Sequence, residues 1–370
     1  MRVNRVEIDL GALRQNYRHL VASLRADVKV IACIKANAYG HGAVEVARVL
    51  EREGVFALAT ASLDDAIRVR EAGVRTPVLL FGGILPDAFE EALAYDLSPT
   101  VYDEESAAAA ARFGKQSPVP VYVKVDCGLE RLGVSLPEAF DFVGRLHRNP
   151  GVSLAGLYTH IPFTDLAGRD WASGQLAEFA KLVSALRTAG IDVPVTQAMA
   201  SSCLLAGLSD DGNAVCPGHL LYGLSPVQDE VADIAPYRPV LRSLRTQLIH
   251  VGRHGPGPPS ASGNRLKTNG TRSIGVVPLG RYDGYRGPLP NRPATMILRG
   301  RRVPVIGVSL EYTTLALDDF EDPQPGESVT VIGDDGDDGI GLPEIADWWG
   351  MSPLDVLMSM NRRLPCAFID

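Results

Sequence analysis

The chain of 370 residues is 46% hydrophobic and 22% charged, a balance typical of globular proteins. Its formal net charge of −8 argues against a nucleic-acid or an anionic-membrane partner, because both need basic patches. No apolar stretch approaches the ~20 residues that span a bilayer, and the N-terminal segment lacks the apolar core of a signal peptide.

From about residue 10 to residue 230, short apolar runs alternate with segments of helical period. Strands are predicted at 28–34, 56–60, 78–81, 119–125 and 154–159, and helices at 43–53, 63–72 and 176–189. Repeated βα units predict a parallel sheet, and this many of them predict a (β/α)8 barrel of the TIM type. A doubly wound open sheet is the alternative, although no G-x-G-x-x-G segment opens the first helix.

After about Tyr237 the sequence changes to short alternating runs between Gly, Pro and Asp turns, at 240–251, 273–279, 294–298, 303–308 and 328–332. These runs predict a smaller, mostly antiparallel β domain, followed by a helix at about 342–361. The fold class is therefore α/β, with the barrel in residues 1–236 and the β domain in 237–370. Residues 1–10 are expected to pair with the β domain, and 255–263 to form an irregular loop.

Neither the acidic run near the C-terminus nor the five cysteines predict a metal site or a disulfide framework. The acidic run 334–338 fails the EF-hand spacing, because a loop counted back from Glu344 would begin at Gly333, so a solvated turn is predicted. The five cysteines form no C-x-x-C pair. They are scattered over the chain: Cys33, Cys127, Cys203, Cys216 and Cys366. A cytoplasmic protein without a metal is the simplest expectation.

The segment KANAYGHG at 35–42 follows the predicted strand 28–34 directly. It places Lys35 at the C-terminal mouth of a barrel strand, where such barrels carry out catalysis, and a lysine there could form a Schiff base. From position alone, a surface lysine in a βα loop is the more ordinary interpretation.

The same segment resembles the pyridoxal 5'-phosphate (PLP) lysine motif of alanine racemases, and the similarity continues in order along the chain. Residues 6–10 (VEIDL) resemble the family's opening strand, and 123–133 (VKVDCGLERLG) its K-x-D-T-G-M-x-R-L-G segment. Residues 156–160 (GLYTH) resemble its G-x-x-T-H strand end, and 217–226 (PGHLLYGLSP) its P-G-x-x-x-Y-G-x-x-P run. The resemblance implies the barrel fold, PLP as the cofactor, and a PLP-dependent isomerase that acts at the Cα of an amino acid.

Particular residues take roles from this resemblance. It implies that Lys35 holds PLP as a Schiff base and serves as an acid/base group, and that His160 lies near the pyridine ring. Lys124 matches a lysine often found carbamylated, and Arg131 its neighbour close to the substrate carboxylate. Four positions match phosphate-binding residues: Tyr39, Ser201, Gly218 and His219. Without the motifs, His160 would be interpreted as a packed core histidine, and Lys124 and Arg131 as structural charges.

The match breaks at the second base, which in the family is a tyrosine from the partner subunit, the first tyrosine of G-Y-x-D-G-Y. Residues 280–285 are GRYDGY, so Arg281 occupies this place, and arginine is a poor base. Tyr282 is one residue along, and on a strand its side chain would point to the opposite face unless a bulge intervened. Tyr312 is another candidate, because Glu311-Tyr312 replaces the family's M-D pair.

Further departures surround the cofactor. Cys216 stands where the family has an arginine facing the pyridine nitrogen, and a neutral thiol would let PLP withdraw electrons more fully. The alternative is that Cys216 fills space while a water meets the nitrogen. Three other positions depart: Gln197, Ala200 and, in place of a phosphate-contacting tyrosine, Arg362. Arg281 and Arg362 suit a substrate with an acidic side chain, a hypothesis that Glu311 partly counters.

The leading interpretation is an alanine-racemase-like amino-acid racemase or epimerase with an altered substrate. Lys35 would be one base, and Tyr312 or Tyr282 the other. One-base PLP chemistry, such as retro-aldol cleavage, hydroxymethyl transfer or decarboxylation, is the alternative, and a non-catalytic PLP-binding homologue is a third. The resemblance also implies a head-to-tail homodimer, in which Arg281, Glu311 and Tyr312 reach the partner's Lys35.

Overall fold

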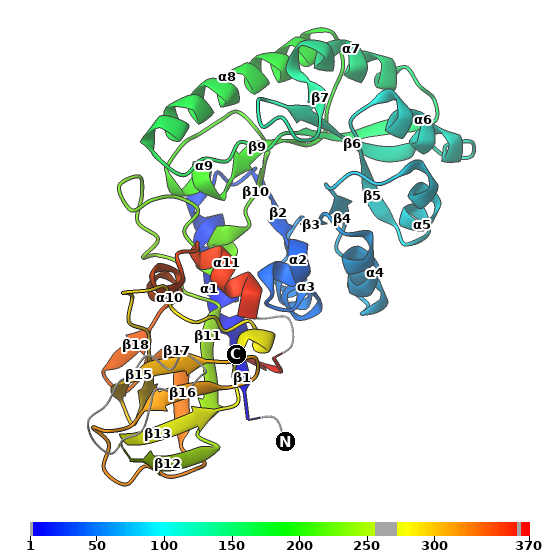
Figure 1. Ribbon diagram of the computed structural model, residues 1–370. Helices are drawn as coiled ribbons and strands as arrows, with labels where there is room; N and C mark the ends of the chain where they lie inside the picture. The colour runs from blue at the N-terminus through cyan, green and yellow to red at the C-terminus, as the bar shows by residue number, and fades with distance from the viewer. Residues whose placement is uncertain (1–2, 256–271, 361–363) are drawn as a thin grey trace. The chain divides into compact units, whose positions relative to one another are not determined.

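The computed structural model describes residues 3–255, 272–360 and 364–370, and the chain divides into two compact units (Figure 1). One unit is Gly11–Arg238, and the other combines Met1–Leu10 with Pro239–Asp370. Among the helices of the described ranges, none has the length and apolar character needed to cross a membrane.

The first unit contains a closed barrel of eight parallel strands, which confirms the predicted fold class. The strands are β2 (Lys29–Cys33), β3 (Ala57–Thr60), β4 (Val78–Leu80), β5 (Leu97–Val101), β6 (Val119–Asp126), β8 (Val152–Tyr158), β9 (Thr196–Ala200) and β10 (Ala214–Cys216). Their order is β5-β4-β3-β2-β10-β9-β8-β6, and pairing of β5 with β6 closes the barrel. A short strand, β7 (Val134–Ser135), pairs with the far end of β6.

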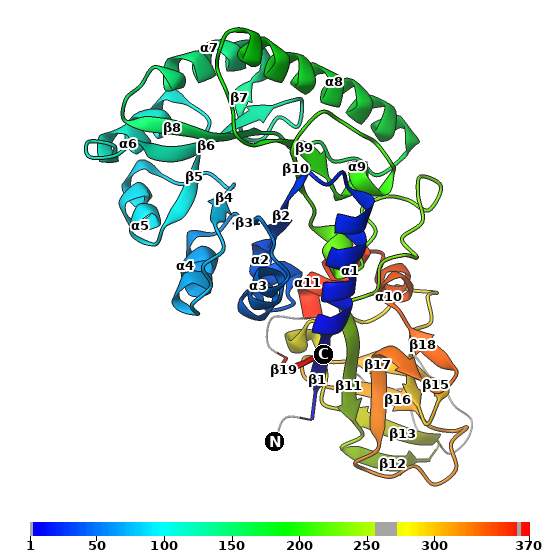
Figure 2. The same cartoon turned by 180° about the vertical axis from the view of Figure 1, so that it is seen from behind.

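Helices follow the strands and cover the outside of the barrel (Figure 2). They are α1 (Leu10–Ser23), α3 (Ala43–Arg52), α4 (Leu63–Glu71), η1 (Pro86–Ala88), α5 (Phe89–Ala94), α6 (Glu104–Phe113), α7 (Leu136–His147) and α8 (Leu166–Thr188). Three shorter turns lie at strand ends: α2 (Lys35–Tyr39), α9 (Ser201–Leu205) and η2 (His219–Tyr222). Helix α8 begins ten residues before the predicted 176–189 because Asp165 caps it, accepting a hydrogen bond from Gly168 N (2.8 Å).

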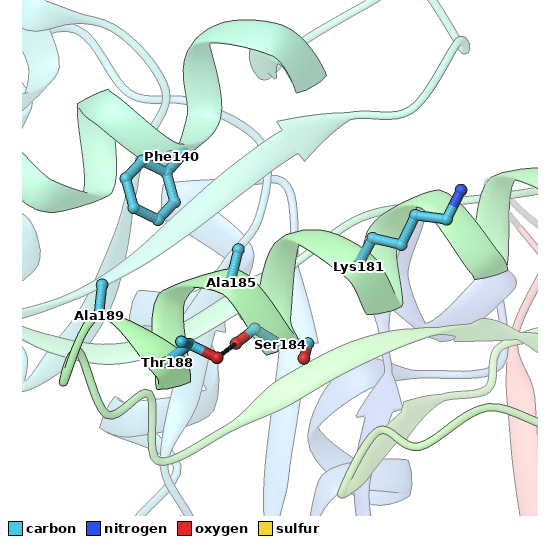
Figure 3. A pocket seen from close by; sticks show the side chains of 6 residues that line it. All are labelled: Phe140, Lys181, Ser184, Ala185, Thr188 and Ala189. Atoms are coloured by element: carbon cyan, nitrogen blue, oxygen red, sulfur yellow. Dashed lines mark hydrogen bonds between the residues drawn. The ribbon is translucent and has the colours of Figure 1, made fainter.

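Side chains from every part of the barrel fill its interior. Small residues on β3, Ala57 and Ala59, face large ones on β6 and β8, Tyr122 and Tyr158. These side chains pack against one another, and the cavity that could receive a ligand lies at the C-terminal ends of the strands. On the outside, a shallow groove of about 560 Å³ runs over α7 and α8, where the aromatic ring of Phe140 faces α8 (Figure 3). It contains no acid–base pair and lies away from the strand ends.

The second unit is a ten-stranded sheet that is antiparallel except where β1 pairs with β19. Its strands are β1 (Arg5–Asp9), β11 (Leu241–Gln247), β12 (His250–His254), β13 (Arg272–Val277), β14 (Thr295–Leu298), β15 (Arg301–Val308), β16 (Thr313–Ala316), β17 (Ser328–Asp335), β18 (Asp338–Ile340) and β19 (Cys366–Ile369). The sheet path is β12-β13-β16-β15-β14-β17-β11-β1-β19, and β18 pairs with β17.

Some elements of this unit differ from the prediction. The run 240–251 holds two strands, β11 and β12, and the predicted helix 342–361 is two helices, α10 (Leu342–Trp349) and α11 (Pro353–Met360). Gly350 in a left-handed conformation (φ 63°) ends α10, and proline at the start of α11 cannot continue a helix. Residues 256–263 of the predicted loop lie outside the described residues.

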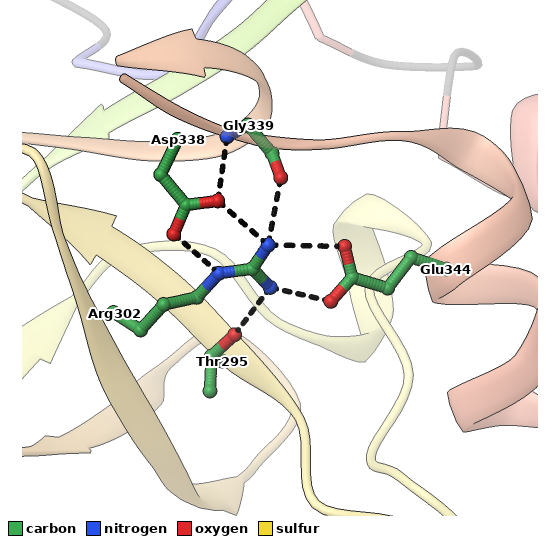
Figure 4. A network of polar contacts seen from close by, with 5 residues as sticks. All are labelled: Thr295, Arg302, Asp338, Gly339 and Glu344. Carbon is green, nitrogen blue, oxygen red and sulfur yellow. Dashed lines mark hydrogen bonds and ion pairs between the residues drawn. The ribbon is translucent and has the colours of Figure 1, made fainter. Parts of the chain in front are cut away.

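Arg302 on β15 connects β18 and α10 to the sheet (Figure 4). Its guanidinium binds both oxygens of Asp338, at 2.7 and 2.9 Å, and also pairs with Glu344. The hydrogen bond from Arg302 lowers the pKa of Asp338. Part of the acidic run 334–338 therefore belongs to a structural ion-pair network.

Candidate active site

A cavity of about 260 Å³ lies at the C-terminal mouth of the barrel strands. It is lined by residues that end or follow β2, β6, β8, β9 and β10. Nine residues singled out from the sequence line it: Lys35, Tyr39, Lys124, Arg131, His160, Ser201, Cys216, Gly218 and His219. Gln197 and Ala200, which depart from the family pattern, line it as well.

Lys35 is followed by an unusual backbone turn. Ala36, Asn37, Ala38 and Tyr39 all have left-handed conformations, with φ between 53° and 55°. Each such residue costs about 1–2 kcal/mol relative to a right-handed conformation. Strain of this kind persists only where the surroundings enforce it, and it is concentrated at functional sites.

The surroundings of the turn enforce its conformation through side chains that the sequence interpretation gave no role. Asn37 Oδ1 accepts a hydrogen bond from Ala43 N (2.9 Å), and Asn37 O accepts one from Gly42 N (3.0 Å). His41 is buried, contacts Ala38 O through Nδ1 (2.9 Å), and stacks on Tyr222 with ring centroids 4.9 Å apart. Burial lowers the pKa of His41 to about 4, so the ring is neutral at pH 7.

Ala36 offers a direct measurement of the strain. Its side chain is exposed, so Ala36→Gly removes a left-handed alanine without opening a cavity. We expect this variant to raise the free energy of unfolding by about 1 kcal/mol. The matched control is Ala108→Gly at an exposed position within α6, where glycine should lower it by about 1 kcal/mol. Urea denaturation of both variants tests the prediction, and a destabilised Ala36→Gly would contradict it.

Residues after β9 and β10 form a cluster of small and polar groups. Ser201 Oγ accepts hydrogen bonds from Gly218 N (2.9 Å) and Leu220 N (3.4 Å). A Cβ on residue 218 would come within 2.3 Å of Tyr39 Oη, so only glycine fits there. The ring of His219 meets Tyr39 edge-on at 5.4 Å. Backbone N–H groups gathered after the last barrel strands are a common place for a phosphate.

Other residues that line the cavity are cationic. Lys124 on β6 is only 4% exposed, and its Nζ lies 5.8 Å from the ring centroid of Tyr158. Burial, reinforced by Arg131, lowers the pKa of Lys124 to about 8. The charged lining residues in the described part of the chain are Lys35, Lys124 and Arg131, and none is a carboxylate. The cavity therefore favours an anionic occupant.

Neutral groups separate these cations. Burial, together with Lys35 and Lys124, lowers the pKa of His160 to about 3, so its imidazole carries no charge at pH 7. Burial raises the pKa of the Cys216 thiol, which keeps it protonated. The wall at the end of β10 therefore presents a neutral thiol where the family pattern has an arginine.

The remaining predicted residues belong to the other unit. Arg281, Tyr282, Glu311 and Tyr312 have exposed side chains on two adjacent loops, with Tyr282 56% and Tyr312 46% exposed. The loops are joined by a hydrogen bond from Arg281 N to Ser309 O (3.0 Å). Arg362 lies outside the described residues.

The backbone at Tyr282 is not the strand that the sequence interpretation assumed. Residues Arg281–Asp283 form a 3-10 turn, η3, in which Gly280 N donates to Asp283 Oδ2 (3.1 Å) and Gly284 adopts φ 90°. Tyr282 N donates to Leu310 O (2.8 Å). The alternation of a strand therefore does not apply, and Tyr282 is not forced to the face opposite Arg281.

Comparisons with known proteins cover both units. Residues 8–226 match the family described as "Alanine racemase, N-terminal domain", and residues 241–368 match "Alanine racemase, C-terminal domain". The chain is similar to the alanine racemase of Sorangium cellulosum, with 35% identity over 99% of this chain and 98% of that protein. It is also similar to that of Halothermothrix orenii, with 31% identity over 97% and 95%. Among solved structures, the alanine racemase from E. faecalis matches with a TM-score of 0.91 and 29% identity, covering 100% and 98% of the two chains.

Proposed function

This chain belongs to the alanine racemase family of PLP-dependent isomerases, and we propose that it racemises or epimerises an amino acid other than the family's usual substrate. The observation that supports the proposal is the mouth of the barrel. There Lys35, a cluster of backbone N–H groups and two further cations meet around one cavity. The altered substrate is inferred from the residues that depart from the family pattern, Cys216 among them.

The residues present fit PLP. Gly218 leaves open the space beside Tyr39 Oη that a Cβ would fill, next to the Ser201 hydroxyl, which accepts hydrogen bonds from two backbone N–H groups and suits a phosphate oxygen. The cations without carboxylate partners suit the charge of a phosphate and an amino-acid carboxylate. PLP bound to Lys35 supplies an electron sink that stabilises negative charge at Cα.

The other steps fall to the chain's own side chains. Lys35 would hold the cofactor and move the proton at Cα from one face. Tyr39, Ser201 and the backbone around Gly218 and His219 would hold the phosphate. Arg131 would bind the substrate carboxylate, and neutral His160 would pack beside the ring without adding charge.

The second proton-transfer group is Tyr312 or Tyr282 in this proposal, since an arginine at position 281 is a poor base. Both tyrosines have exposed side chains, and the η3 turn leaves Tyr282 free of the alternation of a strand. One-base chemistry, in which only Lys35 moves protons, is the second candidate, and Arg281 at the position of the missing tyrosine is the feature that favours it.

Incubation of the PLP-loaded protein in D2O with an amino-acid panel tests the function. The panel includes alanine, the substrate in the family's name. It also includes aspartate and glutamate, because Arg281 and Arg362 suggest a substrate with an acidic side chain. We expect deuterium at Cα together with inversion for one member, read by mass spectrometry and chiral chromatography. Exchange with retention, or loss of mass, would establish the one-base alternative. No exchange with any member would contradict both.

The proposal includes a head-to-tail homodimer with shared active sites. The two loops of the second unit expose Tyr282, Tyr312 and Leu310, the last 66% exposed, and apolar and aromatic patches of this kind mark interfaces. A cytoplasmic location is part of the same proposal and is supported by the five free cysteines.

Mixing two inactive variants tests the shared sites. Lys35→Ala and Arg281→Ala subunits, unfolded and refolded together, should recover about a quarter of the wild-type activity. Half of the dimers formed at random are mixed, and each mixed dimer holds one intact site of two. Each variant refolded alone is the control. Mixed dimers proven by mass spectrometry that show no recovery would rule out shared sites.

A further inference from the structure

The loop 127–133 carries Arg131 and returns to the strand that it leaves. Strand β7 pairs with the end of β6, so Asp126 lies opposite Ser135 and both ends of the loop are fixed. The side chain of Arg131 lines the cavity, yet within the described ranges it makes neither a hydrogen bond nor an ion pair. The place of its guanidinium therefore depends on the backbone of the loop.

One carboxylate organises that backbone. Asp126 Oδ1 accepts hydrogen bonds from three successive N–H groups, those of Gly128 (2.9 Å), Leu129 (2.9 Å) and Glu130 (3.2 Å). Gly128 and Glu130 have left-handed conformations, with φ 99° and 54°, the second unfavourable for a residue with a side chain. Without the carboxylate, nothing else among the described contacts holds these N–H groups together.

Packing limits the backbone conformations that the loop 127–133 can adopt. A Cβ on Gly133 would come within 2.6 Å of Asp126 N, so the returning strand lies tightly against β6. Trp171 of α8 also approaches Gly128, where a Cβ would lie 3.3 Å from the indole. The loop therefore contacts both the Trp171 indole and the Asp126 carboxylate, and Arg131 follows immediately after the last N–H that Asp126 binds.

We infer that Asp126 is a positioning residue, which holds the loop 127–133 in the conformation that aims Arg131 into the cavity. The inference rests on the proposed function, in which Arg131 binds the substrate carboxylate. Asp126 acts through the acceptor capacity of its oxygen, so Asn, which retains an oxygen at Oδ1, should replace it, whereas Ala should not.

A double-mutant cycle on the PLP-loaded protein tests the inference, with the visible absorbance of the cofactor as the readout. The probe is L-alanine, which presents the α-carboxylate common to every candidate substrate and so tests the contact with Arg131 even where another amino acid is preferred. Asp126→Ala should raise the half-saturating L-alanine concentration about tenfold to a hundredfold. This is the effect expected if Arg131 loses its charge-assisted hydrogen bond to the substrate carboxylate. Asp126→Asn should stay within about threefold of wild type. In an Arg131→Ala background, Asp126→Ala should have no further effect, because the group that it positions is gone.

The matched control is Asp103→Ala, which removes a carboxylate that caps α6 through Ser106 N (2.7 Å), away from the cavity. It should leave the L-alanine response unchanged. Additive losses in the double variant, or an Asn variant as impaired as the Ala variant, would overturn the inference. Should Asp126→Ala not fold, Asp126→Ser, which keeps a shorter acceptor, should give an intermediate loss.

Hydrogen exchange separates this inference from the proposed function. Asp126→Ala, but not Asp126→Asn, should speed amide exchange at residues 128–130 of the PLP-loaded protein, whatever amino acid it acts on. A wild-type protein that responds to no amino acid would contradict the proposed function alone. Unchanged exchange in Asp126→Ala would overturn the inference even if the wild-type protein converts an amino acid.

Discussion

Lys35→Ala should abolish the visible absorbance of bound PLP and lower activity by about 10⁴-fold or more, because in the proposed function Lys35 provides both the covalent link to the cofactor and a proton-transfer group. Lys35 lies just after the end of β2. The four left-handed residues that follow it and the stack of His41 on Tyr222 fix the backbone there. The buried lysine that also lines the cavity, Lys124, is on β6, four strands away in either direction round the barrel. It is therefore not placed to replace Lys35.

The control for this prediction is Lys29→Ala, which removes a lysine from the opposite end of the same strand. Its Nζ lies over the ring of Phe56, at 4.8 Å, and it does not line the cavity. It should retain both absorbance and activity. A Lys35→Ala protein that keeps the absorbance band after dialysis would show that another residue holds the cofactor.

The barrel could be predicted from the sequence because its strands are continuous apolar runs. Val28 to Ile34 is such a run, and the structure has β2 at Lys29–Cys33. Strands β5, β9 and β10 were not predicted: β5 includes Ser98 and Thr100, β9 includes Gln197, and β10 is only three residues long. Short strands with a polar residue give little periodic signal, and their pairing in the barrel stabilises them instead.

The backbone around Lys35 shows what local sequence cannot provide. Ala36 and Ala38 are strong formers of right-handed helix, yet both are left-handed here. Contacts from Asn37 and His41, which depend on the folded barrel, reverse the local preference. The residues were in a recognised motif, but no propensity indicates the handedness of the turn.

In the second unit, the sequence contained a signal for the turn at Tyr282. The expectation that Tyr282 lies on a strand was wrong, since Gly280 and Gly284 bracket a 3-10 turn. Glycine at both ends of a short polar segment favours a turn over a strand. For Asp126 the sequence signal was weaker: an Asp two residues before a glycine favours hydrogen bonds to the following N–H groups, but the family resemblance gave roles only to Lys124 and Arg131 in this segment.

The buried ammonium of Lys124 should make stability depend on pH. Its pKa in the folded chain is about 8, below the usual value of 10.5, so between these values the folded state has released a proton that the unfolded state still binds. Stability therefore rises with pH across this window, and the lysine destabilises the fold below pH 8 by about 3 kcal/mol. Lys124→Met removes the charge while keeping a long side chain, so it should be more stable at pH 7 by about this amount and lose that rise.

Urea denaturation of the PLP-free protein at pH 7 and pH 10, in buffers freed of carbon dioxide, measures the effect. The control is Lys29→Met, at a lysine that does not line the cavity. An equal dependence on pH in the wild type and Lys124→Met would contradict the prediction. The argument also connects stability with binding. Burial and Arg131 disfavour the charged form of Lys124, and an anion in the cavity would favour it. A bound carboxylate should therefore raise the pKa of Lys124 and reduce the rise in stability with pH. The same destabilised charge thus favours an anionic substrate.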